Sequence, residues 1–337
     1  MSAVVQAVPA RRSRGDLGTA MLFLLPNLLG FLVFTAGPVL FTLVISFSNW
    51  ELSRTVPFQW VGFQNYIKLF GDPEFWYNLA NTFYLMLGMP VAIFGSLFLA
   101  ILLSQKLRGM VVYRTLFYLP SFTSGVALLI LWKALYNPDF GPIDAIIGWV
   151  LNTLHVNDLI HALFGIRLAP PEWLQSTHNV LGLDVERVHV TGRQFGLGAR
   201  DAIVFMSVWL AIGGNNMLLY LAGLSNIAPE LYEAAELDGA SKWALFKYVT
   251  WPQLAPTTFF IVVMSFIGGL QGGFEQARVM TLGGPAGTTT TLVYHIYQKA
   301  FEEAQIGYAS AVSWVLFTII FAITLANWKF GSREVAE

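Results

Sequence analysis

The sequence contains no cysteine and few charged residues. Without cysteine, the 337-residue chain can form no disulfide, hold no metal through thiolates and use no thiol nucleophile. Charged residues make up 12% of the chain, whereas a soluble domain carries about 25%. The formal net charge is only −1, which argues against a nucleic-acid partner, because nucleic-acid binders display clustered basic charge. These absences exclude a disulfide scaffold, a disordered chain and a nucleic-acid-binding protein.

Apolar side chains are abundant: 55% of the residues are hydrophobic and the mean hydropathy is +0.59. Six stretches lack Asp, Glu, Lys, Arg and His, and each approaches the ~20 residues with which a helix crosses a bilayer. Because backbone polar groups cannot stay unpaired in lipid, these stretches predict an all-α integral membrane protein with six transmembrane helices. The stretches are Thr19–Phe47, Leu79–Gln105, Thr115–Trp132, Ala202–Leu224, Thr257–Phe274 and Tyr308–Asn327. Prolines within them predict kinks at Pro26, Pro38, Pro90 and Pro120.

The first apolar stretch has two interpretations. Arg11, Arg12 and Arg14 precede it and resemble the basic region of a secretory signal peptide. The apolar run is about 29 residues long, however, roughly twice the apolar region of a signal peptide. We therefore expect a retained first helix, with a cleaved signal peptide as the alternative.

The distribution of Lys and Arg around the spans predicts that both termini lie inside. With that orientation the inner side carries ten basic residues near span ends: Arg11, Arg12, Arg14, Lys106, Arg108, Arg114, Lys242, Lys247, Lys329 and Arg333. The short outer loops carry four: Arg54, Lys68, Arg278 and Lys299. The expected organisation is a cytoplasmic tail over residues 1–16, a transmembrane domain over 17–330 and a second cytoplasmic tail over 331–337. The transmembrane domain includes an outer-loop insert at about 137–200 and an inner loop at 225–256.

The outer loop between the third and fourth spans is long. Ile143–Val156 is apolar but too short to span a bilayer, so we expect a helix that lies along the outer interface. Asp184–Gly198 alternates in places and contains glycines, which favours a small hairpin. Four histidines lie in this loop, but their spacing matches no metal-binding motif, so no metal site is predicted: His155, His161, His178 and His189.

The inner loop Ser225–Pro256 predicts a short helix, a turn and a second helix at the membrane surface. Pro229 suits the first turn of a helix, and Gly239 weakens a helix interior, which favours a break there. Ser241 can cap the second helix, and Pro252 and Pro256 are expected to end it before the next span.

One face of this predicted helix pair suits a protein partner. Ala235 and Gly239 lie four residues apart on one face, where small side chains let another backbone approach closely. Large apolar side chains beside them are expected to be exposed: Leu231, Leu237, Trp243 and Phe246. An amphipathic hairpin that lies on lipid is the alternative.

The same loop resembles the EAA loop of ABC-importer permeases, whose pattern is EAA-x3-G-x9-I-x-L-P. Here Glu233-Ala234-Ala235 is followed by Gly239 and then by Val249-x-Trp251-Pro252, with Val and Trp in place of Ile and Leu. The resemblance covers about 280 residues and is strongest to the carbohydrate branch, with the maltose-type membrane subunits as the nearest comparison. Residues 177–199 lie outside the pattern. Further matching segments are Val61-Gly62-Phe63-Gln64-Asn65-Tyr66, Leu119-Pro120, Tyr136-Asn137-Pro138, Leu221-Ala222-Gly223-Leu224 and Thr281-Leu282-Gly283-Gly284-Pro285.

The resemblance implies a permease subunit of a carbohydrate-type, maltose-like, binding-protein-dependent ABC importer in a bacterial or archaeal cytoplasmic membrane. Its fold would be the six-helix type I importer fold with a cytoplasmic coupling helix. The implied partners are a second permease subunit in a heterodimer, two ATPase subunits, an extracytoplasmic solute-binding protein, and a sugar or polyol substrate. The chain has no G-x-x-x-x-G-K-[ST] phosphate loop, so we expect no catalytic residue and no bound cofactor here, with ATP and Mg on the partner ATPase. The implied coupling residues are Glu233, Ala234, Ala235, Asp238 and Gly239.

Candidate substrate-path residues lie in the fourth and fifth spans, from which the maltose-type subunits contact ligand. Because the predicted spans carry no charge, we expect a neutral, hydroxyl-rich ligand held by amides and aromatic faces. The candidates are Trp209, Asn215, Asn216, Gln271 and Phe274. Interhelical hydrogen bonding is the alternative role of the two asparagines. Gly269, Gly272 and Gly273 stand where the maltose-type subunit has bulkier or amide side chains. Glu275 is interpreted as an ion-pair partner of Arg278, with a position facing the outer mouth as the alternative.

Other classes of membrane protein explain the sequence less well. A secondary active transporter of a small polar solute is the main alternative, but such proteins place ionisable residues inside their spans. A membrane enzyme would need a catalytic or metal motif that the scattered histidines do not provide. A structural or receptor-type membrane protein would leave the EAA spacing unexplained.

The absence of cysteine allows a direct test of the predicted topology. Single cysteines introduced by Thr55→Cys and Ser332→Cys should react with a membrane-impermeant maleimide from opposite sides of the membrane, because the first lies in an outer loop and the second in the inner tail. Labelling is compared in intact cells and in inverted vesicles. Reaction of both cysteines from the same side would contradict the six-span model.

Overall fold

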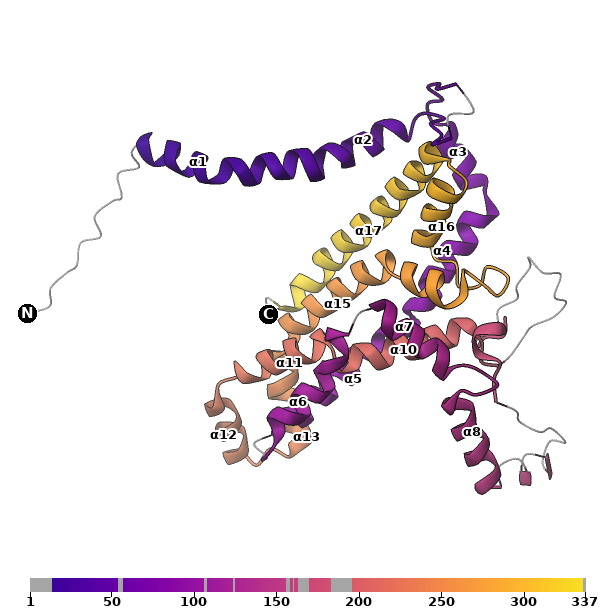
Figure 1. Cartoon of the computed structure of the whole chain (residues 1–337). Coiled ribbons are helices and arrows are strands. Elements are labelled where there is room, and N and C mark those ends of the chain that lie inside the picture. Colours follow the sequence, from indigo (N-terminus) through magenta and orange to yellow (C-terminus); the bar gives the residue numbers. More distant parts are fainter. Residues whose placement is uncertain are drawn as a thin grey trace, which may run out of the picture.

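The computed structural model describes residues 14–53, 57–105, 108–123, 125–155, 158–159, 161–162, 170–182 and 196–335. These residues are all-helical, with one isolated β-bridge between Ser48 and Trp60 and no strand among them (Figure 1). The first helices are α1 (Arg14–Phe31), α2 (Gly37–Ile45), α3 (Gln64–Gly71), α4 (Pro73–Leu85), α5 (Met89–Ser104), α6 (Met110–Tyr118), α7 (Gly125–Leu135) and α8 (Pro142–Thr153). After the outer loop come α10 (Ala199–Ile212), α11 (Asn215–Ser225), α12 (Pro229–Leu237), α13 (Lys242–Leu245), α14 (Trp251–Gln253), α15 (Ala255–Gln271), α16 (Leu292–Tyr297) and α17 (Ile306–Val335).

Short segments of other helix types join several of these helices. The 3-10 turns are η2 (Met86–Gly88), η3 (Leu119–Phe122) and η4 (Trp173–Gln175). The π-helical turns are η1 (Leu32–Ala36), η6 (Phe246–Thr250), η7 (Gln276–Thr281) and η8 (Gln298–Glu302).

Within the part of the chain that the structure describes, four helical runs are long and apolar enough to cross a membrane: Met21–Ile45, Pro73–Ser104, Ala199–Ser225 and Ile306–Lys329. Two bent pairs raise the number of candidate spans to six if each pair counts as one. The first pair is Met110–Phe122 with Gly125–Leu135, bent by 97°, and the second is Lys242–Gln253 with Ala255–Gln271, bent by 63°. The six stretches predicted from the sequence therefore correspond to four continuous candidates and two bent ones.

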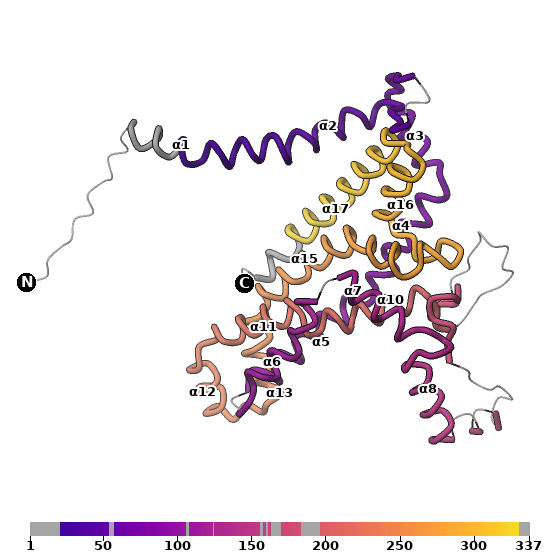
Figure 2. Tube along the Cα trace, viewed as in Figure 1, coloured from indigo at the N-terminus to yellow at the C-terminus, as the bar shows by residue number. Residues whose placement is uncertain are grey.

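The first span lies apart from the remainder of the molecule. Figures 1 and 2 show α1 and α2 running away from the other helices, with α2 near the end of α17. Only 6% of its most apolar window is buried within the chain, and a hydrogen bond from Trp314 Nε1 to Thr42 Oγ1, 3.3 Å long, attaches α2 to α17. Its apolar surface therefore faces the surroundings of this chain.

Prolines in the spans coincide with changes of helix type, for a physical reason. A proline has no N–H, and its ring collides with the carbonyl four residues earlier in a regular α-helix. The residue before Pro38, Gly37, donates its N–H five residues back, to Leu32, and Trp251 before Pro252 donates in the same way to Phe246. This π-helical widening keeps a hydrogen bond while making room for the ring.

The kinks predicted at Pro38, Pro90 and Pro120 thus fall where the helix type changes. In contrast, Pro26 lies inside α1. Pro252 lies one residue before the end of the helical run Lys242–Gln253, and Pro256 lies in the first turn of α15 beyond a 63° bend, so the second helix of the loop ends before the fifth span as expected.

Three clusters of buried side chains hold the body together. One joins α5, α11 and α15, and contains Leu97, Met217 and Ile261. A second joins α4, α15, α16 and α17, and a third joins α7, α10 and the loop turn at Trp173. The core therefore runs between the spans rather than in one central mass.

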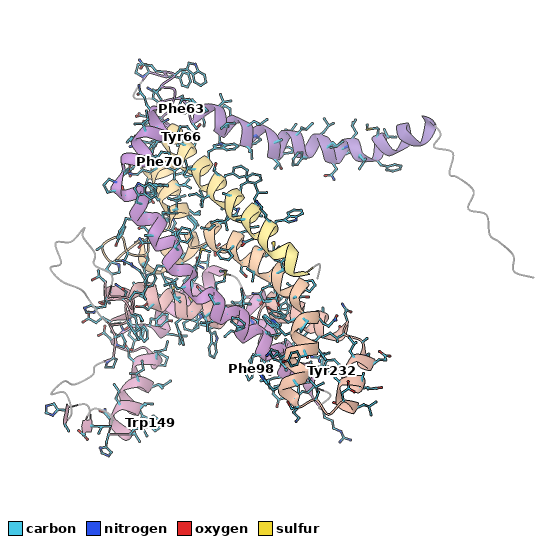
Figure 3. The ribbon with its side chains drawn as sticks, turned by 180° about the vertical axis from the view of Figure 1, so that it is seen from behind. Phe63, Tyr66, Phe70, Phe98, Trp149 and Tyr232 are labelled. Atoms are coloured by element: carbon cyan, nitrogen blue, oxygen red, sulfur yellow. The ribbon has the colours of Figure 1, made fainter. Side chains whose placement is uncertain are left out.

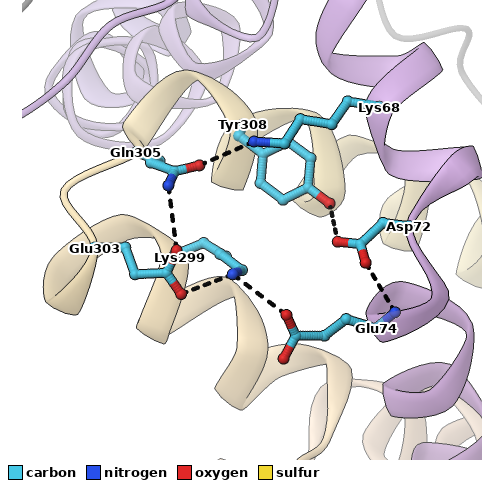
Figure 4. A network of polar contacts seen from close by, with 7 residues as sticks. All are labelled: Lys68, Asp72, Glu74, Lys299, Glu303, Gln305 and Tyr308. Atoms are coloured by element: carbon cyan, nitrogen blue, oxygen red, sulfur yellow. Dashed lines mark hydrogen bonds and ion pairs between the residues drawn. The ribbon is translucent and has the colours of Figure 1, made fainter.

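The two ends of the molecule differ in chemistry. In Figure 3, Phe63, Tyr66 and Phe70 lie at the end formed by α3, and Phe98 and Tyr232 lie at the opposite end. Near α3 a polar network ties α3 and α4 to η8 and α17 (Figure 4). Lys299 bridges Glu74 at 3.4 Å and Glu303 at 2.7 Å, and Tyr308 donates a 3.0 Å hydrogen bond to Asp72. This network lies on the side predicted to face outward.

The structure corrects three boundaries of the predicted spans. α10 begins at Ala199 instead of Ala202, and α4 begins at Pro73, so Arg200, Asp201 and Glu74 lie within span candidates. The prediction of charge-free spans is therefore wrong at these ends. α15 ends at Gln271, because Gly273 adopts φ +84°, and this places Phe274 beyond the helix.

Several predictions concern residues outside those that the structure describes. Most of the proposed hairpin at Asp184–Gly198 is among them, as are His189, Thr55, Arg11 and Arg12. The short helix expected at Ile143–Val156 is present as α8.

Candidate functional site

The loop Ser225–Pro256 folds as two helices joined by a glycine turn. Pro229 occupies the first turn of α12, and the side chain of Ser241 accepts a 3.3 Å hydrogen bond from the N–H of Ala244 at the start of α13. Between them Gly239 adopts φ +82°. Its N–H bonds to Glu236 O and the next N–H, of Ala240, bonds to Ala235 O, both at 3.0 Å. This pair of bonds is the Schellman arrangement that ends a helix, and it needs a residue at ease with positive φ. The glycine of the EAA spacing is therefore a helix terminator.

The surface of this hairpin is open on one side and anchored on the other. Leu237 is 89% exposed and Trp243 is 69% exposed, next to the exposed residues Glu233, Ala234 and Asp238. Tyr232 anchors the hairpin through a 3.0 Å hydrogen bond to Thr250. Ala235 is half-buried.

The expectation that Phe246 is exposed is wrong. It is half-buried and packs against the cluster of α5, α11 and α15 as well as against Trp243 and Trp251. The exposed apolar surface of the hairpin therefore consists of Leu231, Leu237 and Trp243.

A cavity of about 300 Å³ lies between α4, η2, α5, α10 and α15. Its charge-free lining combines aliphatic side chains with hydroxyl and amide groups. The polar lining residues are Thr82, Ser207, Asn216, Ser265, Gln276 and Thr291, and four glycines complete one wall: Gly268, Gly269, Gly272 and Gly273. Such a site can hold a neutral polar molecule through hydrogen bonds.

The glycines of α15 set how close its neighbours come. A Cβ on Gly269 would lie 2.9 Å from Met86, whereas a Cβ on Gly268 would meet nothing within 4 Å. Across the cavity, α10 and α11 are separated by Gly213 and Gly214, and a Cβ on Gly213 would lie 2.4 Å from the carbonyl oxygen of Phe117. Gly213 therefore allows α6 to touch the break in the fourth span, while Gly268 faces open space.

The structure brings one of the five predicted substrate-path residues, Asn216, into the cavity. Asn215 lies on another side of α11, where its Oδ1 accepts a 3.1 Å hydrogen bond from Tyr118. Trp209 is 63% exposed and lines two separate apolar hollows on α10. Gln271 is exposed, and Phe274 packs against Tyr294 and Tyr297.

Sequence reasoning missed the hydroxyl groups of the cavity. On α10, Ile203, Ser207 and Ala211 recur every four residues and line the cavity together. That spacing was visible in the sequence, but nothing in it marks which face of an apolar helix turns inward. Gln276 and Thr291 lie beyond the fifth span, and only the fold of the following segment returns them to the cavity.

The ion pair of Arg278 differs from the expectation. Arg278 donates a 2.7 Å hydrogen bond to Glu302 rather than pairing with Glu275, and that hydrogen bond raises the pKa of Arg278 above its ordinary value. Among the described residues, no group of three His, Asp or Glu side chains could hold a metal ion.

Comparison with known proteins gives a consistent result. The family described as "Binding-protein-dependent transport system inner membrane component" matches residues 51–328. The "Probable ABC transporter permease protein YesP" of Bacillus subtilis (strain 168) is 34% identical, over 97% of this chain and 94% of the relative. The "Lactose transport system permease protein LacF" of Rhizobium radiobacter is 31% identical, over 93% of each chain.

A solved structure shares the fold. A chain from the "Crystal structure of bacterial alginate ABC transporter in complex with alginate pentasaccharide-bound periplasmic protein" aligns with a TM-score of 0.69, at 22% identity, over 96% of each chain. The all-helical arrangement described above is therefore the type I ABC permease fold.

Two glycine substitutions should distinguish a closely packed position from an open one. We expect Gly213→Ala to destabilise the purified chain by about 1–3 kcal/mol, because the new methyl group meets the Phe117 carbonyl. Gly268→Ala should be neutral or stabilising by up to about 1 kcal/mol, because it gains helix propensity without a collision. Thermal unfolding in detergent measures both, and equal melting temperatures for the two variants would contradict the packing described here.

Proposed function

Because the chain belongs to the family of binding-protein-dependent transport system inner membrane components, we propose that it is the permease subunit of an ATP-driven sugar importer. In this proposal it takes a sugar or related polyol from a solute-binding protein and passes it across the cytoplasmic membrane by alternating access. The observation that carries the proposal is the glycine-terminated hairpin α12–α13, an exposed apolar surface fixed to the ends of the spans.

The proposed topology has six spans and both termini inside. Each bent pair, α6–η3–α7 and α13–α15, then crosses the membrane once. The excess of Lys and Arg around α12 and α13 and before α6 supports an inner position for this end. The chain then presents the hairpin to the cytoplasm and the polar network of Figure 4 to the outside.

The hairpin α12–α13 is proposed to be the coupling helix that docks on an ATPase subunit. Glu233, Ala234, Ala235, Asp238 and Gly239 would form its contact surface. Tyr232 and Phe246, which pack toward the spans, would transmit movement of the hairpin to α5 and α15. ATP and Mg would bind to the two partner ATPases, whose closure shifts the spans between two packings.

The cavity is proposed to be part of the substrate path. Its hydroxyl and amide groups suit the hydroxyl groups of a sugar, and Asn216 is its contribution from the predicted set. Trp209, Asn215, Gln271 and Phe274 are proposed to meet the substrate only in other states or at the boundary with a second permease subunit. The heterodimer with that second subunit is part of the proposal.

Affinity purification from native membranes in mild detergent, with mass spectrometry of the partners, tests the proposal. We expect a second permease of similar size, an ATPase with Walker motifs, and, in the presence of substrate, a solute-binding protein. Recovery of this chain alone, with transport activity but no ATPase, would contradict the proposal and favour a secondary active transporter.

Gly239→Asp should uncouple ATP hydrolysis from uptake. The new carboxylate extends from the contact surface next to Asp238, while the position itself has open space and a φ that Asp tolerates. We expect sugar uptake to fall at least ten-fold while the protein stays at normal levels in the membrane. Uptake of labelled sugar and ATPase activity are measured in the same vesicles.

Two control variants distinguish docking from backbone strain. Gly239→Asn keeps nearly the same shape without the charge and should lose less activity. Gly109→Asp introduces the same residue at another open position with φ +83°, at the start of α6, and should transport normally. Normal uptake by Gly239→Asp at normal membrane levels would refute the coupling assignment.

A further inference from the structure

Arg200 is a buried cation at the end of a candidate membrane span. It lies in the first turn of α10, within the candidate span Ala199–Ser225, and is only 5% exposed. A charged side chain in such a place is costly unless another group compensates its charge. The first turn of a helix adds to this cost, because the positive end of the helix dipole repels a cation.

The protein compensates the charge of Arg200 only weakly. One guanidinium nitrogen, Nη2, donates a 3.3 Å hydrogen bond to the hydroxyl of Tyr77. The guanidinium carbon lies 5.2 Å from the ring centre of Tyr84 and 5.8 Å from that of Tyr77. The Nε–H group is buried and has no hydrogen-bond partner. Two aromatic faces and one long hydrogen bond thus hold a group that can donate five.

The carboxylate of the neighbouring residue, Asp201, makes its hydrogen bonds to other groups. Asp201 accepts hydrogen bonds from the Tyr84 hydroxyl and from the N–H groups of Val180 and Gly198. No ion pair among the described residues includes Arg200, whereas Arg278 pairs with Glu302 and Lys299 with two glutamates. Arg200 therefore differs from Arg278 and Lys299, which have carboxylate partners.

The position of Arg200 relates it to the cavity. Ile203, Ser207 and Ala211 line the cavity, and Arg200 stands three residues before Ile203 on the same face of α10. On the facing helix α4, Tyr77 and Tyr84 are seven residues apart and share one face, while the lining residue Thr82 lies on another side of that helix. Arg200 thus continues the cavity-lining stripe of α10, about 10 Å along the helix from Ser207 at 1.5 Å per residue, and lies just beyond the residues that line the cavity itself.

We propose that Arg200 is the anion-binding residue of the transport path and that the substrate is a sugar carrying an oxyanion, as a uronate carboxylate or a phosphate ester. The planar guanidinium matches either group through paired hydrogen bonds. Tyr77 and Tyr84 cover it in the present state, and separation of α4 from α10 at this end presents it to the substrate. This inference rests on the proposed function and replaces the neutral ligand expected from charge-free spans.

Binding to the purified importer complex, without its binding protein, tests the inference. The probes are digalacturonate, its uncharged dimethyl ester, and galactose 1-phosphate. Binding of each probe is measured through the tryptophan fluorescence of the complex. We expect at least ten-fold tighter binding of one charged probe than of the ester, and the probe that shows this preference identifies carboxylate or phosphate. Arg200→Gln should abolish the preference, and Arg200→Lys should keep part of it.

Arg278→Gln is the matched control, because Arg278 also lies over a tyrosine ring, at 4.6 Å from Tyr297, but is paired with Glu302. It should keep the full preference for charge. Equal binding of charged and uncharged probes by the wild type, no binding of either charged probe, or an unchanged preference in Arg200→Gln would overturn the inference. If Arg200→Gln does not assemble, the comparison of charged and uncharged probes on the wild-type complex tests the inference by itself. If an ATPase co-purifies with the chain, these outcomes overturn the inference about Arg200 but leave the proposed function unchanged. If no ATPase co-purifies, the proposed function itself is contradicted.

Discussion

Every backbone N–H and C=O group of a membrane span must find its partner inside the protein, because hydrocarbon offers none. This constraint explains why the spans are helices and also how they are interrupted. Before Pro38 and before Pro252 the helix widens into a π turn, so that the preceding N–H keeps a bond five residues back. At the end of α12, the N–H groups of Gly239 and Ala240 make two further backbone bonds. Bends and turns therefore occur where the backbone can still be satisfied.

The same constraint concentrates polar side chains at a few places. One end of the molecule joins α3, α4, η8 and α17 through ion pairs and hydrogen bonds, and the opposite end exposes the apolar residues of α12 and α13. Between them lies a cavity with hydroxyl and amide groups but no charge. Under the proposed function the first end would meet a binding protein and the second an ATPase, which calls for different chemistry at the two ends. The distribution of polar groups agrees with that division.

From the sequence, some residues of the hairpin and the cavity could be predicted and others could not, for physical reasons. Gly239 could be identified as a helix break because glycine weakens a helix interior and the EAA spacing singled it out. Asn216 was found because an amide in an apolar span is conspicuous. Ser207 was overlooked, since a serine in a span is common and its direction depends on packing. Arg200 was placed in a loop because the apolar run begins at Ala202, while the helix begins one turn earlier, where the Asp201 carboxylate accepts the N–H of Gly198.

The amino-acid sequence by itself determined the membrane class, the approximate spans and the helix pair of the inner loop, because apolar run length, basic flanks and the propensities of proline and glycine are local properties. Only the tertiary structure decided which faces of the spans meet. It turned Asn216 toward the cavity and Asn215 toward Tyr118, returned Gln276 and Thr291 to the cavity wall, and buried Arg200 between α10 and α4. Such choices depend on the packing of helices distant in the chain, and in apolar spans no periodic polar face reveals them.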